Sequence, residues 1–282
     1  MSGSARHPRI SAVVLTKNED INLERCIESL GFCAEVLVLD SGSTDRTEEI
    51  ARRMGAAWYV HVQPPPFRIS EQRNWILDHH PFPEGQWILY LDADETVTPA
   101  LRERLCGIAD GEVDHTHYEL TPRYLFLGKF LKRTLGYPNW HARLLRFGST
   151  RFAGGVWEHF SSEVPAGRIE EPYDHFAYSK GFSDWLARHD RYSTWDAESA
   201  VAYLESGDEA SLGTARKVGL RRIAARWWPL RPVTRFLLLY FCRRGFLEGW
   251  QAFLFSLMYG VYEFMTVMKI IELRRRRKGL PL

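Results

Sequence analysis

Two acidic residues stand two positions apart directly after an apolar run, in the segment WILYLDADE at residues 87–95. In an extended chain such side chains point to one side, so Asp92 and Asp94 would share a side while Ala93 faces the other. Two carboxylates this close resist joint ionisation unless a cation offsets their charge. Mg²⁺ or Mn²⁺ would do so and would also bind phosphate oxygens. Ordinary solvated turns contain the same triplet, so its place after a strand is what favours a metal.

A second polar segment, SGSTD at residues 41–45, follows the apolar run that ends at Asp40. Gly42 would let the backbone approach a ligand closely, and a helix starting there would offer free N–H groups. Asp40 could accept a hydrogen bond from the ring N–H of a base. The alternative is an ordinary strand-to-helix turn with a helix cap. The segment Thr16–Glu19 allows the same two interpretations.

The elements that must position these residues alternate between strand and helix. Such alternation predicts an α/β fold with a mostly parallel sheet covered on both faces, and ligands then bind beyond the carboxyl ends of the strands. Beyond residue 116 the pattern changes to strands at 118–127 and 143–152 and a polar helix at 180–205. The earlier predicted strands are Ile10–Thr16, Glu35–Asp40, Ala57–Val62 and Gln86–Leu91, and the earlier helices are Ile21–Leu30 with Asp20 as its cap, Asp45 to Gly55, Ser70–His79 and Pro99–Ala109.

The chain of 282 residues has a formal net charge of +2 and is 45% hydrophobic, which excludes a disordered or collagen-like protein. The near-neutral total conceals a split, because residues 1–212 carry a charge of −10 and residues 213–282 carry +12. This asymmetry predicts two parts with different partners, residues 1–212 and a basic apolar helical tail over 213–282. The four cysteines form no CxxC pair, which favours a reduced, cytoplasmic compartment.

The order and spacing of four segments carry a family resemblance. They are VVLTKNE, EVLVLDSGSTDRTEEIA, SEQRN and WILYLDADE, and together they resemble the family 2 glycosyltransferases with the GT-A (Rossmann-like) fold over residues 10–105. More loosely, the chain up to about residue 265 resembles a bacterial branch that assembles the lipopolysaccharide core and related surface glycans. The resemblance implies a nucleotide-sugar donor, a glycan or lipid-linked acceptor and a divalent metal. It also implies that residues 1–212 form the catalytic domain, with a nucleotide-sugar-binding half at 10–110 and an acceptor-side half at 111–212.

The resemblance also implies a role for each donor-side residue. Asp40 would contact the uracil or other base, and Thr16 and Glu19 would line the nucleoside pocket. Asp92 would lie near the ribose and Asp94 would bind the metal. Arg73 stands where basic residues of the family approach the nucleotide, although an exposed helix arginine is the alternative.

On the acceptor side, the resemblance implies that Glu158 is the catalytic base, which takes the acceptor proton during an inverting displacement. The branch usually reads Val-His-Glu where this chain has Val156-Trp157-Glu158, so Trp157 departs from the pattern and could stack on a sugar. Glu158 could instead be a surface acid. His175 would complete the metal site, with His159 as another candidate and a structural histidine as the alternative.

Two arginines resemble the paired arginines of the same branch. If Arg143 and Arg146 alternate on a strand they would share one side, so that one or both meet phosphate; solvent-facing positions are the alternative.

The basic tail contains two apolar segments, Arg231–Phe246 and Trp250–Ile271, with clusters of arginine on both sides of the second. A single crossing would place one cluster on the wrong side of the membrane. We therefore expect a helical hairpin, bent at Gly245 and Gly249, that lies in the cytoplasmic leaflet. The alternatives are a homo-oligomer interface or a helix pair packed on the catalytic domain. The aliphatic runs argue against nucleic acid as the partner.

The sequence thus predicts an inverting, metal-dependent glycosyltransferase that uses a nucleotide-sugar, preferentially a UDP-sugar, at the inner face of a bacterial membrane. One alternative is a sugar-phosphate nucleotidyltransferase, but the glycine-rich loop that such enzymes carry after their first strand is missing from Thr16–Glu19. The other is a catalytically silent, membrane-docked binder of nucleotide-sugars.

Overall fold

The computed structural model describes residues 6–65, 67–111, 113–154, 158–207 and 215–282. The chain divides into two compact units. Unit 1 contains the residues up to Leu125 together with Tyr137–Ser179, and unit 2 contains Phe126–Gly136 and Lys180–Leu282. The division after Ser179 differs from the expected boundary at 212, because the helix at 181–206 packs with the C-terminal helices.

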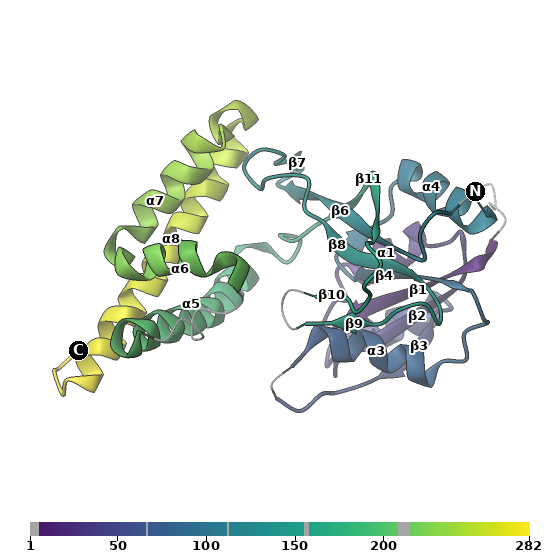
Figure 1. Cartoon of the computed structure of the whole chain (residues 1–282), viewed down its shortest axis with the longest axis horizontal. Helices are drawn as coiled ribbons and strands as arrows, with labels where there is room; N and C mark the ends of the chain where they lie inside the picture. The colour runs from purple at the N-terminus through teal and green to yellow at the C-terminus, as the bar shows by residue number, and fades with distance from the viewer. Residues whose placement is uncertain (1–5, 66, 112, 155–157, 208–214) are drawn as a thin grey trace. The chain divides into compact units, whose positions relative to one another are not determined.

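Unit 1 is built on a sheet whose first half is parallel (Figure 1). This half has the order β3-β2-β1-β4, and every neighbouring pair in it is parallel. The mostly parallel, Rossmann-like sheet predicted for this region is confirmed. The strands are β1 (His7–Thr16), β2 (Cys33–Asp40), β3 (Ala57–Val60) and β4 (Trp87–Asp92).

The second half of the sheet is mixed. Antiparallel β8 (His141–Arg146) joins β4 to β6 (His117–Phe126), and β11 (Gly167–His175) runs parallel to β6. The short β5 (Glu95–Thr96) pairs with the end of β11 and so brings Glu95 opposite His175. A separate ribbon consists of β9 (Phe152–Ala153) and β10 (His159–Phe160).

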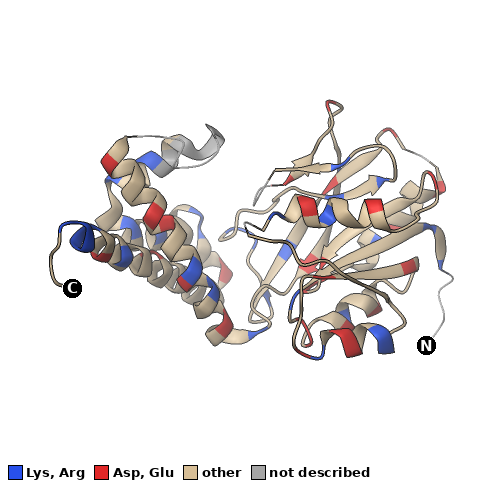
Figure 2. Ribbon diagram, turned by 90° about the horizontal axis from the view of Figure 1, so that it is seen from below, with Lys and Arg blue, Asp and Glu red and all other residues tan. Residues whose placement is uncertain are grey.

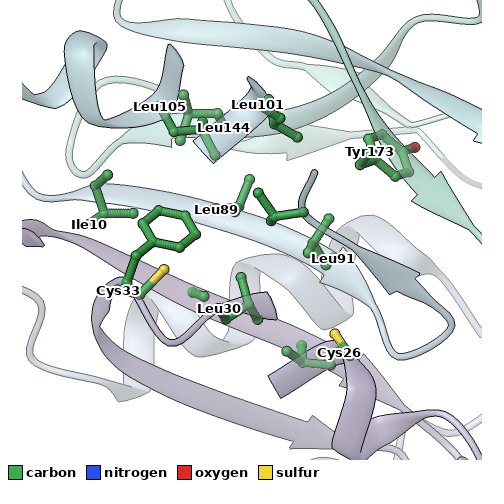
Figure 3. Packing of buried hydrophobic residues seen from close by; sticks show 14 of the residues in the cluster. Ile10, Cys26, Leu30, Cys33, Leu89, Leu91, Leu101, Leu105, Leu144 and Tyr173 are labelled. Atoms are coloured by element: carbon green, nitrogen blue, oxygen red, sulfur yellow. The ribbon is translucent and has the colours of Figure 1, made fainter. Parts of the chain in front are cut away.

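Helices cover both faces of the parallel half because its buried side chains alternate between two hydrophobic clusters. On one face Val14 and Leu89 pack with α1 (Leu23–Ser29), α2 (Thr47–Arg53) and α4 (Pro99–Asp110), as Figure 3 shows in part. On the other face Val13 and Ile88 pack with α3 (Ile69–His79). The buried sheet therefore gives the residues at its carboxyl edge a rigid base.

Two helix starts differ from the prediction. Helix α1 begins at Leu23 with Asn22 at its N-cap, and Ile21 is exposed instead of lying on the apolar face. Helix α2 begins at Thr47, whose N–H donates to Asp45 Oδ1 at 3.0 Å. In both places the polar turn after the strand extends further than predicted, and the helix begins one or two residues later.

Unit 2 is helical apart from the short β7 (Lys129–Phe130). Helix α8 packs against α5 and against the segment that begins with α7, and the chain reverses direction at Arg244 and Gly249, which both have positive φ. Helix α8 is long and apolar enough, by length and composition, to cross a membrane. The elements are α5 (Gly181–Ser206), α6 (Ala215–Arg226), the 3-10 turn Trp228–Leu230, α7 (Arg231–Leu237), the π turn Leu238–Cys242, the 3-10 turn Gly245–Glu248 and α8 (Trp250–Arg277).

Candidate active site

Three of the predicted site residues end neighbouring parallel strands. Thr16 lies opposite Asp40 in the pairing of β1 with β2, and Leu15 lies opposite Asp92 in the pairing of β1 with β4. Register alone therefore gathers Thr16, Asp40 and Asp92 at one carboxyl edge, the place where parallel sheets bind ligands.

Asp40 stabilises the turn that follows its strand. Its Oδ2 accepts the N–H groups of Gly42 at 2.8 Å and Ser43 at 2.7 Å, and the Ser43 hydroxyl donates to Oδ1. Gly42 has a φ of +88°, a conformation that a side chain would strain. The alternative of an ordinary strand-to-helix turn thus describes the contacts of Asp40, although Asp40 does not cap α2, whose N-cap is Arg46; its role toward a base stays a prediction.

The hydroxyl of Thr16 is buried and has no hydrogen-bond partner among the described residues. A buried polar group without a partner costs free energy, so an atom of a ligand at this edge would satisfy it. Nearby, Glu19 holds its own loop in shape: its Oε2 accepts from Asn22 Nδ2 at 2.8 Å, and its N–H donates to Thr47 Oγ1 at 2.8 Å.

The acidic turn after β4 is closed by Glu95, a residue that the sequence reasoning did not single out. Glu95 is fully buried, and its Oε2 accepts the N–H of Asp92 at 2.9 Å. Arg143 Nη2 donates to both acids, to Asp92 Oδ2 at 2.9 Å and to Glu95 Oε1 at 2.7 Å. Glu95 is part of the quoted run WILYLDADE, but that run does not reveal which of its acids is buried.

Arg143 and Arg146 do not share a side of their strand. Arg143 is buried beside Asp92 and Glu95, whereas Arg146 is exposed. The expectation of a shared side is wrong, because residues three positions apart in a strand point to opposite sides.

Arg73 joins the predicted base to the acidic turn. It is 1% exposed, and its Nη1 lies 2.8 Å from Glu158 Oε1 while its Nη2 lies 3.5 Å from Asp92 Oδ1. The same Nη1 donates to the Ala142 carbonyl at 2.9 Å. The alternative of an exposed helix arginine is therefore excluded, and Glu158 is an inward-facing acid, not a surface one.

Only one of the two carboxylate oxygens of Glu158 has a partner among the described residues. Its Oε1 meets Arg73, whereas its Oε2 is buried without a hydrogen-bond partner among the described residues. Burial raises the pKa of Glu158, and Arg73 and Arg143 partly offset that rise. A carboxylate in such surroundings is a stronger proton acceptor than one in water. Val156 and Trp157, the latter predicted to stack on a sugar, lie outside the described residues.

His175 and Asp94 form a pair, as their assignment to one metal site requires. Their Nε2 and Oδ2 atoms are 3.3 Å apart, and His175 Nδ1 lies 3.6 Å from Glu95 Oε1. Burial lowers the pKa of His175, but the charges of Asp94, Glu95 and Asp92 outweigh it and raise the pKa to about 9. His159, the other candidate, is exposed.

The site as a whole balances acids against two guanidinium groups. Burial alone would raise the pKa of Asp92, but Arg143 and Arg73 outweigh it and hold that pKa below its usual range. Asp92 is therefore ionised, while Glu158 at the other end of Arg73 has a raised pKa. Carboxylates in unlike surroundings can take unlike chemical roles.

Comparison with known proteins identifies the family. Residues 11–147 match the family described as Glycosyl transferase family 2. A relative named lipopolysaccharide core biosynthesis glycosyltransferase LpsC, from Rhizobium meliloti (strain 1021), is 28% identical over 96% of this chain and 95% of its own length. These matches support membership of glycosyl transferase family 2 for the part of the chain at residues 11–147. The family resemblance predicted from the four segments is confirmed.

Other proteins similar to this family 2 member are less informative. An uncharacterized glycosyltransferase of Rickettsia bellii (strain RML369-C) is 27% identical over 94% of this chain and 87% of its own length. A crystal structure of glucosyl-3-phosphoglycerate synthase from Mycobacterium tuberculosis is 24% identical, with a TM-score of 0.36, over 50% of this chain. The match spans 57% of the mycobacterial chain.

Proposed function

We propose that this family 2 member is an inverting glycosyltransferase that moves a sugar from a nucleotide-sugar, preferentially a UDP-sugar, to a glycan or lipid-linked saccharide. The observation that carries the proposal is the pair of contacts by which the buried Arg73 links Glu158 to Asp92, at the carboxyl edge of a parallel sheet. These contacts support a role for Glu158 as proton acceptor beside a turn suited to a charged donor. The LpsC relative supports an acceptor in the lipopolysaccharide core or another bacterial surface glycan.

In the transfer step, Glu158 takes the proton of the acceptor hydroxyl. The hydroxyl oxygen bonds to the anomeric carbon while the bond from that carbon to the diphosphate oxygen breaks. The nucleoside diphosphate leaves with the bonding electron pair, and the anomeric centre is inverted. Arg73 positions Glu158 through the 2.8 Å contact, which leaves the unpartnered Oε2 as the oxygen that receives the proton.

The residues near Asp94 suit a divalent metal. No group of three or more His, Cys, Asp and Glu arranged for a metal occurs among the described residues, but Asp94 and His175 together offer a carboxylate and an imidazole. These two would hold Mg²⁺ or Mn²⁺, and phosphate oxygens of the donor would fill further positions. Such a cation, when bound, neutralises negative charge on the departing diphosphate.

The donor pocket would use Thr16, Glu19 and Asp40 on the nucleoside side. The unpartnered Thr16 hydroxyl supports this assignment, since a bound nucleoside would supply a partner. The enzyme would work on the cytoplasmic side of a bacterial membrane, where nucleotide-sugars are made.

A panel of nucleotide-sugars tests the proposal. Each would be incubated with the full chain, Mn²⁺ or Mg²⁺ and truncated lipopolysaccharide, and the released nucleotide would be identified. We expect nucleoside diphosphate from one donor and a rise in melting temperature with that donor. Pyrophosphate would indicate a nucleotidyltransferase, and donor binding without transfer would indicate a silent binder; either result would overturn the proposal.

The variant Asp94→Ala tests the metal site separately. We expect it to lose transfer and Mn²⁺ binding but to remain folded with a somewhat lower melting temperature, because Asp94 lies outside the hydrophobic clusters although it pairs with His175. The exposed acid Asp114 offers a matched control, and Asp114→Ala should behave as the unmodified protein does. Undiminished transfer by Asp94→Ala would exclude it as a metal ligand.

A further inference from the structure

Helix α8 of unit 2 buries polar residues among its packed apolar ones and leaves a row of large apolar residues exposed. Ser256, Glu263 and Thr266 are buried. In contrast, the stripe residues, as we call them, are exposed by 36–60% although all are large and apolar; they are Trp250, Leu254, Leu257, Val261, Phe264 and Met268. A helix on the surface of a water-soluble protein shows the opposite arrangement.

The spacing of the stripe residues makes them one continuous surface. Successive members are three or four positions apart, and at about 100° per residue they stay on one side of the helix. The buried residues Ala252, Tyr262 and Ile270 lie on the opposite side. Further exposed apolar side chains occur where the chain turns before α8: Phe241, Phe246 and Leu247.

The acids of this region are paired internally. Glu263 Oε1 accepts from Arg235 Nε at 2.9 Å, and its Oε2 accepts from Arg231 Nε at 2.5 Å. Glu248 is buried and accepts the N–H groups of Arg133 at 2.7 Å and Thr134 at 2.8 Å. Glu272 is the exposed acid of α8, and the run Arg274–Lys278 follows it directly. The exposed side of α8 is therefore apolar over the stripe residues. Lys and Arg gather at its C-terminal end, as the blue ribbon in Figure 2 shows.

A basic pocket continues the stripe at that end. Ile271, Arg275 and Lys278 keep the same spacing of three or four positions after Met268. Together with Trp228, Arg274 and Leu280 they line an open, mostly apolar surface depression of about 210 Å³. Cationic side chains next to aromatic and aliphatic ones suit a phosphate that carries acyl chains.

We propose that unit 2 binds the surface of an anionic phospholipid bilayer with α8 in the membrane plane. The stripe residues enter the acyl region, and the pocket lined by Arg274, Arg275 and Lys278 holds a lipid phosphate. Charge complementarity favours an anionic lipid over the α8 of a second copy, because that helix would bring the same cations. This binding does not depend on the proposed transfer reaction.

The ion pairs of α5 favour a helix in the plane over a helix that crosses the bilayer. Lys269 of α8 donates to the Asp190 carboxylate of α5 at 2.6 Å, so the two helices stay together. Helix α5 also carries the charged residues Arg191 and Glu198 on exposed positions. If α8 crossed the membrane, these charges would be drawn into hydrocarbon at high cost.

Vesicle co-sedimentation of the full chain tests the proposal. We expect binding to vesicles of phosphatidylcholine with one third phosphatidylglycerol, and at least tenfold weaker binding to phosphatidylcholine alone. The variant Leu257→Glu/Phe264→Glu should lose binding, because two charges would enter the acyl region. The matched control Val164→Glu changes an exposed valine of unit 1 and should bind as the unmodified chain does.

A second pair of variants tests the pocket. Arg274→Ala/Lys278→Ala should weaken binding to the anionic vesicles about tenfold or more. Arg276→Ala/Arg277→Ala removes the same charge outside the pocket lining and should weaken binding by much less. Equal losses in the two variants would refute the lipid pocket.

Sedimentation velocity without vesicles separates lipid from self-association. A dimer that Leu257→Glu/Phe264→Glu converts to a monomer, with vesicle binding unchanged, would show that the stripe binds a second copy and would overturn the proposal. None of these measurements uses a sugar donor. A negative result would therefore contradict the membrane proposal without bearing on the proposed transfer reaction.

Discussion

Two buried guanidinium groups hold the carboxylates of the site in their places. Arg143 contacts Asp92 and Glu95, and Arg73 contacts Asp92 and Glu158. Removing one member of such a buried network leaves an uncompensated charge, which commonly costs about 3–5 kcal/mol. Conservative replacements therefore test the chemical role of each residue best, because they disturb the fold least.

The variant Glu158→Gln keeps the shape of the side chain and removes the proton acceptor. We expect kcat to fall by a factor of about 10²–10⁴ while the dissociation constant of the donor stays nearly unchanged, because base catalysis contributes to the reaction and not to donor binding. Isothermal titration and initial rates measure the two quantities. His159→Gln changes the exposed neighbour and should leave both unchanged; a loss of donor binding in Glu158→Gln would exclude it as the base.

The variant Arg73→Lys retains one positive charge but loses the planar group that reaches both acids. Arg73 lowers the pKa of Glu158, so a weaker contact lets that pKa rise further. A base acts only when deprotonated, and the acidic limb of the kcat/KM profile should therefore move to higher pH. Arg68→Lys replaces an exposed arginine that pairs with Glu71 and should leave the profile in place. An unshifted limb in Arg73→Lys would mean that Arg73 does not act through Glu158.

At the scale of elements, local patterns predicted the parallel half of the sheet. Strand β4 is a continuous apolar run, and helix α3 follows a helical spacing of apolar residues. Both patterns can be recognised within a short window of sequence. The strand β11 was not predicted, since its sequence GRIEEPYDH has no apolar run. Its pairing with β5 nevertheless sets Glu95 opposite His175, and the contact of Arg143 with Asp92 likewise joins residues far apart in the chain. The site residues could thus be predicted from their motifs. The residues that contact them could not, because those contacts depend on which strands lie next to one another in the sheet.

The turn before α8 depends on a glycine without room for a side chain. A Cβ at Gly245 would lie 2.7 Å from the Leu239 carbonyl oxygen and 2.9 Å from Thr134 Oγ1. We expect Gly245→Ala to lower the free energy of unfolding of unit 2 by about 1–3 kcal/mol through overpacking. Gly107 lies exposed within α4 with nothing near its Cβ position, and Gly107→Ala should raise stability by about 0.5–1 kcal/mol. Urea titration followed by circular dichroism measures both, and equal stability of the two variants would contradict the packing argument.

At the scale of the whole molecule, the chain contributes two separate segments to unit 2, and the charge split along the sequence corresponds only to the second of them. The segment Phe126–Gly136 belongs to unit 2 although it interrupts unit 1 in sequence. Glu248 binds the backbone of Arg133 and Thr134, and the ring of Phe126 lies 5.3 Å from that of Phe255. A change of charge along the sequence marks the basic tail but gives no sign of this returning segment.

The returning segment determines how the chain can be divided. A chain that ends at Ser179 keeps residues 126–136 but loses Glu248 and Phe255, so Phe126 and Leu131, which are buried in the full chain, would become exposed. We expect this truncated chain to aggregate in size-exclusion chromatography. Replacing 126–136 in it by a Gly/Ser linker of equal length should restore a monomer whose melting temperature still rises with the nucleotide-sugar. If the chain ending at Ser179 were already monomeric and as stable as the linker variant, the segment would not depend on unit 2 for its burial.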